Sequence, residues 1–256
     1  MSAIAADPTS FAWANSWFAD RSVLIVGGSS GIGAAIARGF LSACAKVTIT
    51  GVTDDEIGAV TANPELRGAT ALTLDVRDID AVEATIGSIE KLDCLVNCAG
   101  IIRRGEELDP SVFAQVIDIN LTGTMRCCAA ARPALTNSAS PAILNIASML
   151  SYFGGGLVPG YSASKGGIVQ LTKSLAIAYA PDTIRVNALA PGWIATPLTK
   201  GLRDDPDRSR TILERTPLGR WGQPNDVASA ALFLCSPAAA FITGSVVNVD
   251  GGYAAM

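Results

Sequence analysis

Three side chains with complementary proton chemistry stand near the middle of the chain: the hydroxyl of Ser148, the phenol of Tyr161 and the ammonium of Lys165. If the run after Pro159-Gly160 is helical, the spacing of four places Tyr161 and Lys165 on one face. A free tyrosine has a pKa of about 10, so at neutral pH its phenolate needs a nearby positive charge. Lys165 is placed to supply that charge, and the pattern predicts an acid/base pair.

Ser148 follows the apolar run 142–147, which reads as a buried strand. Its hydroxyl is therefore expected at a strand terminus, where open α/β sheets build their sites. The alternative is that Tyr161 and Lys165 form an ordinary pair on a helix surface and that Ser148 is a turn residue. A Tyr-x-x-x-Lys match arises by chance, so the rest of the chain must decide.

Composition favours one α/β domain. The chain has 256 residues, of which 49% are hydrophobic and 16% charged, as suits a sheet buried on both faces by helices. We expect this domain over residues 21–256, after an aromatic leader over residues 1–20. The leader either packs on the domain edge or caps the site of a neighbouring subunit.

Charge and cysteine usage exclude several classes of protein. A net charge of -4 without a basic cluster argues against nucleic-acid binding and leaves small molecules as partners. No apolar run reaches the ~18 residues of a membrane span, so we expect a cytoplasmic enzyme. Histidine is absent, which rules out a Ser-His-Asp hydrolase. The six cysteines show no CxxC spacing, so we expect reduced thiols and no metal site.

A glycine-rich turn near the N-terminus has the context of a dinucleotide site. The β-rich run Ser22–Val26 leads into Gly27-Gly28-Ser29-Ser30-Gly31-Ile32-Gly33, and helical spacing follows over Ala34–Phe40. Glycines let the backbone approach a pyrophosphate, and the N-H groups at a helix start favour its charge.

The next strand, Lys46–Thr50, departs from the usual ribose signal. Gly51 stands where an acidic residue for the 2'-hydroxyl is expected, and neither Val52 nor Thr53 is the arginine that a 2'-phosphate would need. The acidic cluster 54–56 should repel a phosphate. We therefore favour NAD as the cofactor, with NADP as the alternative.

Two further strands and a long helix follow in the first part of the chain. Asp75 and Val76 end the strand 71–74, where Asp75 either holds the adenine or caps the helix that begins near residue 78. The strand 92–96 ends in the small-residue turn Asn97-Cys98-Ala99-Gly100. Asn120 lies inside the apolar-periodic helix 113–131, where asparagine is disfavoured unless it serves a purpose, either packing or function.

The C-terminal part continues the alternation of strands and helices. The strand 184–190 ends in the loop 191–197, and the polar stretch that follows predicts either a helical lid over about residues 196–217 or a solvated surface helix. A helix over 226–234 and a strand over 245–252 complete the pattern. The whole predicts a doubly wound parallel sheet of about seven strands, a Rossmann-type fold.

Taken together these motifs resemble the short-chain dehydrogenase/reductase family over residues 21–256. Departures are modest: Val26 and Cys98 stand where the family often has threonine and asparagine. The resemblance implies hydride transfer between an alcohol and a ketone, commonly by a homotetramer. It implies that Tyr161 is the acid/base, that Lys165 binds the nicotinamide ribose and lowers the pKa of the phenol, that Ser148 binds the substrate oxygen, and that Asn120 holds a relay water. The implied cofactor-binding positions are Gly27, Ser29, Ser30, Gly31, Ile32, Gly33, Val52, Asp75, Val76, Asn97, Ala99, Gly100, Tyr161, Lys165, Pro191, Gly192, Ile194 and Thr196.

Within this family the chain is most similar to sugar-acid dehydrogenases of the 2-keto-3-deoxygluconate and gluconate type. The segments that carry this likeness are 148–151, 154–156, 208–215 and 219–222. Two other functions remain open: a reductase of 3-ketoacyl thioesters or cyclic ketones, and a dinucleotide sensor without catalysis. The set of Ser148, Tyr161, Lys165 and Asn120 argues against the sensor.

Overall fold

One parallel sheet organises the protein. The computed structural model describes residues 11–256, and over that range seven strands pair in the order β3-β2-β1-β4-β5-β6-β7. Their bounds are β1 Ser22–Val26, β2 Lys46–Gly51, β3 Thr70–Thr73, β4 Cys94–Asn97, β5 Ala142–Ile146, β6 Arg185–Pro191 and β7 Val246–Val249. The strand order reverses between β1 and β4, the place where open α/β sheets leave a crevice for a ligand. The predicted doubly wound sheet is confirmed.

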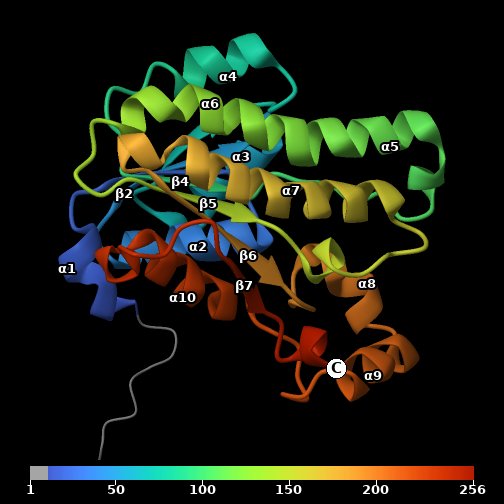
Figure 1. Ribbon diagram of the computed structural model, residues 1–256. Coiled ribbons are helices and arrows are strands. Elements are labelled where there is room, and N and C mark those ends of the chain that lie inside the picture. The colour runs from blue at the N-terminus through green and yellow to red at the C-terminus, as the bar shows by residue number, and fades with distance from the viewer. Residues whose placement is uncertain (1–10) are drawn as a thin grey trace, which may run out of the picture.

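Helices cover both faces of this sheet (Figure 1). Their bounds are α1 Asn15–Phe18, α2 Gly31–Ser42, α3 Asp54–Ala62, α4 Ile79–Ile86, α5 Pro110–Ile117, α6 Gly123–Leu135, α7 Pro159–Ala178, α8 Lys200–Arg203, α9 Pro206–Glu214 and α10 Pro224–Cys235. In Figure 1, α4, α5, α6 and α7 lie on one side of the sheet, and α1, α2 and α10 lie on the other.

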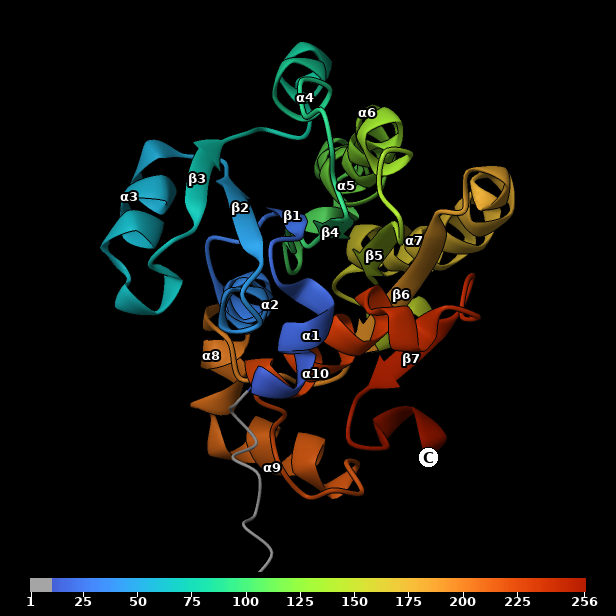
Figure 2. The same ribbon diagram turned by 90° about the vertical axis from the view of Figure 1, so that its left-hand side faces the viewer.

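Alternation along the central strand feeds two apolar cores. Val23 and Ile25 of β1 pack into the core shared with α2 and α10, whereas Leu24 and Val26 face the core beneath α4 and α6. This burial of both faces explains why the strand sequences read as continuous apolar runs. Figure 2 shows the sheet between its two helical layers.

The described end of the aromatic leader belongs to the first core. Phe18 is fully buried, and its ring meets that of Phe40 edge to face, with centroids 4.9 Å apart. Phe11 joins the same cluster. Residues 1–10 of the predicted leader lie outside the described residues.

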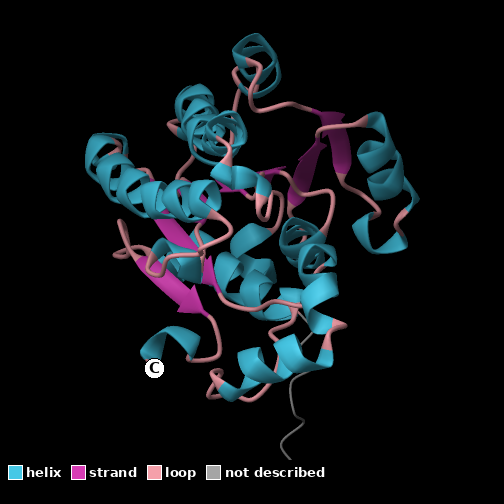
Figure 3. Ribbon diagram, turned by 90° about the vertical axis from the view of Figure 1, so that its right-hand side faces the viewer, coloured by secondary structure: helices cyan, strands magenta, loops and turns pink. Residues whose placement is uncertain are grey.

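Three local predictions need refinement. The single helix expected over 113–131 consists of α5 and α6 joined by a π-helical turn, Asp118–Thr122. The stretch expected to be a lid holds the two short helices α8 and α9, which project from the body of the molecule (Figure 3). The cap of α4 is Asp78, whose carboxylate accepts from the Ala81 N-H, so Asp75 does not cap that helix.

In the described range, no helix has the length and apolarity to cross a bilayer.

Candidate active site and dinucleotide pocket

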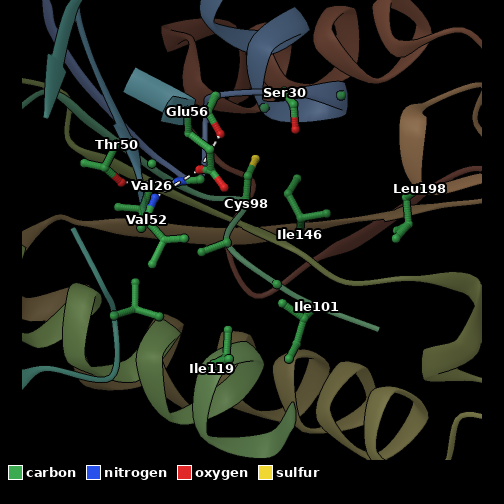
Figure 4. Close-up of a pocket in the computed structure, with 18 of the residues that line it drawn as sticks. Val26, Ser30, Thr50, Val52, Glu56, Cys98, Ile101, Ile119, Ile146 and Leu198 are labelled. Carbon is green, nitrogen blue, oxygen red and sulfur yellow. Dashed lines mark hydrogen bonds between the residues drawn. The ribbon is translucent and has the colours of Figure 1, made fainter. Parts of the chain in front are cut away.

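A pocket of about 610 Å³ lies along the carboxyl ends of the strands. It runs from the glycine turn after β1, past the ends of β2 and β3, to Tyr161 and Lys165 on α7. Figure 4 shows Glu56, Thr50 and Val52 at one end of the pocket, with Ile101, Ile146 and Leu198 farther along it. Its walls are therefore the ones that the sequence motifs predicted for a dinucleotide.

The glycine turn has the close approaches that such a ligand requires. A side chain on Gly27 would lie 2.5 Å from the backbone of Ala99, and one on Gly33 would lie 2.3 Å from the Gly27 carbonyl oxygen. Ser30 is the N-cap of α2 but makes no side-chain bond to that helix. The N-H groups of the first turn can therefore receive an anion, and the turn fits a pyrophosphate.

The carboxylate at the adenosine end of the pocket belongs to Glu56 of α3 and not to the last residue of β2. Glu56, in the first turn of α3, accepts hydrogen bonds from the Ser29 hydroxyl and the Val52 N-H, each at 3.0 Å. A side chain on Gly51 would come within 2.7 Å of the same carboxylate oxygen. Gly51 therefore leaves room at the end of β2 for Glu56, and Figure 4 shows this carboxylate within the pocket.

Asp75 and Arg77 form the other charged group at this end. The Arg77 Nε and Nη2 atoms donate to Asp75 Oδ2 at 3.0 and 2.6 Å, and both residues line the pocket. The guanidinium lowers the pKa of the Asp75 carboxyl, chiefly through these hydrogen bonds. The arginine nearest the adenosine end is therefore already paired with a carboxylate.

The opposite end holds the predicted proton chemistry. Ser148 follows β5 and is 8% exposed, and Tyr161 and Lys165 lie one turn apart near the start of α7. The Lys165 ammonium is 5.6 Å from the centre of the Tyr161 ring and donates to the Ile146 carbonyl oxygen at 2.7 Å. The Ser151 hydroxyl binds the Lys165 carbonyl oxygen at 2.7 Å and so joins the turn after β5 to α7.

Burial controls the protonation of this end. The pKa of Tyr161 is raised, first because the phenol is desolvated and also because of the Glu107 charge, while a hydrogen bond with Ser148 opposes the rise. Desolvation lowers the pKa of Lys165 to about 8. The positive charge of Lys165 was expected to lower the pKa of the Tyr161 phenol. In the structure the pKa of this phenol is raised instead, because desolvation is the largest influence on it.

Asn120 lies in the π-helical turn, and its amide is used for structure. It donates to the Ile101 carbonyl oxygen at 3.0 Å and to the Ser164 hydroxyl at 3.1 Å, and it accepts from the Ile101 N-H at 2.8 Å. A side chain on Gly100 would approach both the Asn120 amide and the Lys165 ammonium, at 3.3 and 3.6 Å. Asn120 therefore lies beside the predicted catalytic group and anchors the loop that faces it.

Most predicted cofactor positions line the pocket, and four do not. Asn97 is buried, with its amide donating to Asn145 at 2.9 Å between β4 and β5. Pro191 ends β6, and Gly192 packs against Asp250. Ile194 belongs to the core beside α2 and borders a second cavity. These four residues do not line the pocket, whereas Thr196 lies on its wall.

Four charged residues of this region were missed as site residues from the sequence, and one of them is Arg77, described above. Glu56 was noticed only as part of an acidic cluster, because nothing in a strand pattern reveals that a helix side chain reaches back to the strand end. Arg103 lines the pocket from the exposed loop after β4. Glu107, only 1% exposed, binds the Tyr161 N-H at 2.7 Å. A glutamate in a polar run reads as solvated, so its burial had no sequence signal.

Comparison with known proteins agrees with this geometry. A family model described as enoyl-(acyl carrier protein) reductase matches residues 26–254. The 2-dehydro-3-deoxy-D-gluconate 5-dehydrogenase of Bacillus subtilis (strain 168) is 37% identical over 239 residues, which cover 91% of this chain and 94% of that protein. The L-tagatose-forming galactitol 2-dehydrogenase of Cereibacter sphaeroides is 39% identical over 243 residues, which cover 90% and 93%.

A solved structure extends the likeness to three dimensions. The gluconate 5-dehydrogenase of Burkholderia cenocepacia J2315, in complex with NADP and tartrate, superimposes with a TM-score of 0.87 at 32% identity. The match covers 97% of this chain and 99% of that one.

Proposed function

The chain belongs to the short-chain dehydrogenase/reductase family, and from that premise we propose that it oxidises a secondary hydroxyl of a sugar acid, or reduces the corresponding ketone. It is an NAD(P)-dependent oxidoreductase that acts on CH-OH groups. The observation that carries the substrate chemistry is that Tyr161 and Lys165 line the end of a pocket whose other parts fit a dinucleotide, and that Ser148 forms a hydrogen bond with Tyr161.

The proposed chemistry assigns one task to each side chain. In the oxidation the Tyr161 phenolate removes the proton of the substrate hydroxyl. Bound NAD(P) would supply the acceptor for the hydride that leaves the carbon bearing that hydroxyl. Ser148 donates to the substrate oxygen, where negative charge develops. Lys165, whose ammonium points along the pocket floor to Ile146, is placed to bind the ribose hydroxyls and to favour the phenolate.

Arg103 favours an acid over a neutral polyol as the substrate. Arg103 lines the same pocket as Tyr161, and it lies on the loop that Asn120 anchors through Ile101. A guanidinium at that wall provides a paired hydrogen-bond donor for a carboxylate. The named relatives include both a sugar-acid and a galactitol enzyme, and the positive charge of Arg103 is our reason for favouring the acid.

A substrate panel tests the proposal. Purified protein with NAD or NADP is offered gluconate-type acids, galactitol and, in reverse, acetoacetyl thioesters, and formation or loss of reduced cofactor is followed by absorbance. The proposal expects the highest kcat/KM with an acid. Turnover of thioesters alone would replace it with the second candidate, an acyl-thioester ketone reductase, which the description of the matching family model favours.

Glu56 supports NAD as the preferred cofactor, although the related Burkholderia structure holds NADP. Its carboxylate can accept from a ribose 2'-hydroxyl but repels a 2'-phosphate. Arg77 remains bound to Asp75 and is not free to offset that repulsion.

The cofactor proposal is tested by titrating the protein with NADH and NADPH and following fluorescence. We expect tighter NADH binding in the wild type and a shift of about tenfold toward NADPH in Glu56→Gln, which corresponds to about 1.4 kcal/mol. Asp55→Asn, an equal change of charge on an exposed neighbour, should leave the ratio unchanged. Tighter NADPH binding in the wild type would overturn the NAD assignment and point to Arg77 as a phosphate ligand.

We further propose that the enzyme works in the cytoplasm as a homotetramer. The family resemblance and exposed apolar residues such as Met125 on α6, Ile177 on α7 and Phe241 beside β7 support the assembly. Light scattering of the purified protein measures the assembled mass, and a monomeric mass would contradict this proposal.

A further inference from the structure

A buried carboxylate joins the catalytic helix to the loop that faces the substrate. Glu107, in the short 3-10 helix η3 Glu106–Leu108, accepts from the Tyr161 N-H through one oxygen and from the Arg103 N-H through the other, each at 2.7 Å. It is 1% exposed. Figure 1 shows the start of α7 beside the start of α5, which follows this turn.

Glu107 serves as the missing cap of α7. Val158, at the N-cap position, has no side-chain hydrogen bond to the helix, and the carboxylate of Glu107 satisfies the N-H of Tyr161 in the first turn instead. A negative charge is favoured there by the dipole of a 20-residue helix. A side chain on Gly160 would meet both this carboxylate and Phe113, at 3.3 Å each, so the glycine lets the carboxylate sit directly against the helix start.

The same carboxylate contacts two segments with different tasks. Its first bond is to the backbone N-H of Tyr161, which carries the proposed catalytic phenol, and its second is to the backbone N-H of Arg103, which lines the pocket. A backbone bond between Gly105 and Leu157, at 2.7 Å, joins the same two segments nearby. Glu107 therefore ties the backbone of Tyr161 to the backbone of Arg103.

We propose that Glu107 is a positioning residue of the reaction, which holds Tyr161 and Arg103 at the separation that the substrate requires. The inference rests on the proposed role of Tyr161 as the acid/base. Glu107 touches neither substrate nor cofactor in this role; it acts through the two backbone groups that it binds. Misplacement of reacting groups by about 1 Å can lower the rate by about 10²-fold. Loss of the two hydrogen bonds of Glu107 should therefore lower kcat.

The charge of Glu107 provides a second, independent readout. The groups that face the Tyr161 phenol are Ser148 after β5, Lys165 on α7 and Glu107 on η3, with the Cys98 thiol beyond Lys165. Of these, Glu107 raises the pKa of the phenol. Its neutralisation should move the pH midpoint of alcohol oxidation to a lower value.

The test compares Glu107→Gln, Glu107→Asp and the matched control Glu106→Gln, whose side chain is exposed. For Glu107→Gln we expect kcat to fall by about 10- to 100-fold, with the pH midpoint lowered and NADH binding unchanged. Glu107→Asp keeps the charge but shortens the reach, so kcat should fall while the midpoint stays near that of the wild type. Glu106→Gln should behave as the wild type.

Two results would overturn the inference. One is a Glu107→Gln enzyme with wild-type kcat and pH profile. The other is a variant that loses only thermal stability, in which case Glu107 is a cap without a catalytic consequence. If Glu107→Gln does not fold, Glu107→Asp provides the test, because a wild-type kcat in that variant would also contradict a positioning role for Glu107. A fully active Tyr161→Phe enzyme would instead refute the proposed function, so the two failures are distinguishable.

Discussion

The two ends of the pocket differ in how closely they follow the sequence motifs. At the catalytic end, Ser148 and Lys165 are at most 8% exposed, and each predicted residue has the expected neighbours. At the adenosine end the expected acidic residue is a glycine, and a more solvated glutamate from the next helix fills its place. Catalysis requires each side chain at a fixed position around the reacting atoms. Recognition of a ribose requires only a carboxylate near its hydroxyl groups, and more than one structural element can supply that carboxylate.

Removing the phenol should have the largest effect at the catalytic end. Tyr161→Phe keeps the ring but removes the proton acceptor, so we expect kcat to fall by about 10²- to 10⁴-fold. NADH binding, followed by fluorescence, should change little, because the contacts of the adenosine end are intact. Substantial residual turnover would show that the chemistry does not depend on Tyr161, and would contradict the assignment of a separate catalytic end to this pocket.

Ser148→Ala tests the second group of the same end. Loss of a donor to the developing oxyanion typically costs about 10²- to 10³-fold in kcat, and the substrate KM should change much less. A variant that raised KM alone would show that Ser148 binds the ground state and the transition state equally.

Arg103→Gln tests whether the substrate side of the pocket selects a carboxylate. We expect about a tenfold loss of kcat/KM for an acid, because an exposed charge-assisted hydrogen bond is lost, and little change for galactitol. The neighbouring Arg104→Gln is the matched control, since Arg104 is equally exposed and does not line the pocket. Equal losses for the acid and the polyol would contradict the proposed selection.

The smallest expected effect is the pH dependence of cofactor binding. Because desolvation lowers the pKa of Lys165 to about 8, its ammonium is present below that pH and is lost above it. NADH titrations of the free enzyme should therefore show weaker binding, by a few-fold, as the pH rises through about 8. Constant affinity from pH 7 to about 9.5 would show that Lys165 does not bind the ribose through its charge.

The sequence predicted the doubly wound parallel sheet and brought Ser148, Tyr161 and Lys165 together as a candidate catalytic group, because both inferences follow from local patterns. Apolar runs mark the strands, and the spacing of four between Tyr161 and Lys165 holds wherever a helix forms. Long-range contacts were not accessible in this way. The reach of Glu56 to the end of β2, the burial of Glu107 against α7 and the π-helical turn around Asn120 depend on how elements pack.

The most direct test of the account is the pH dependence of kcat for oxidation and reduction of one hydroxy acid and its ketone. Desolvation raises the pKa of Tyr161 from its ordinary value, which favours the phenol needed for reduction over the phenolate needed for oxidation. Oxidation should therefore accelerate steadily as the pH rises into the alkaline range, and reduction should remain nearly constant near neutrality. An oxidation rate that does not change with pH, in an enzyme whose chemical step limits turnover, would contradict the assignment of Tyr161 as the acid/base.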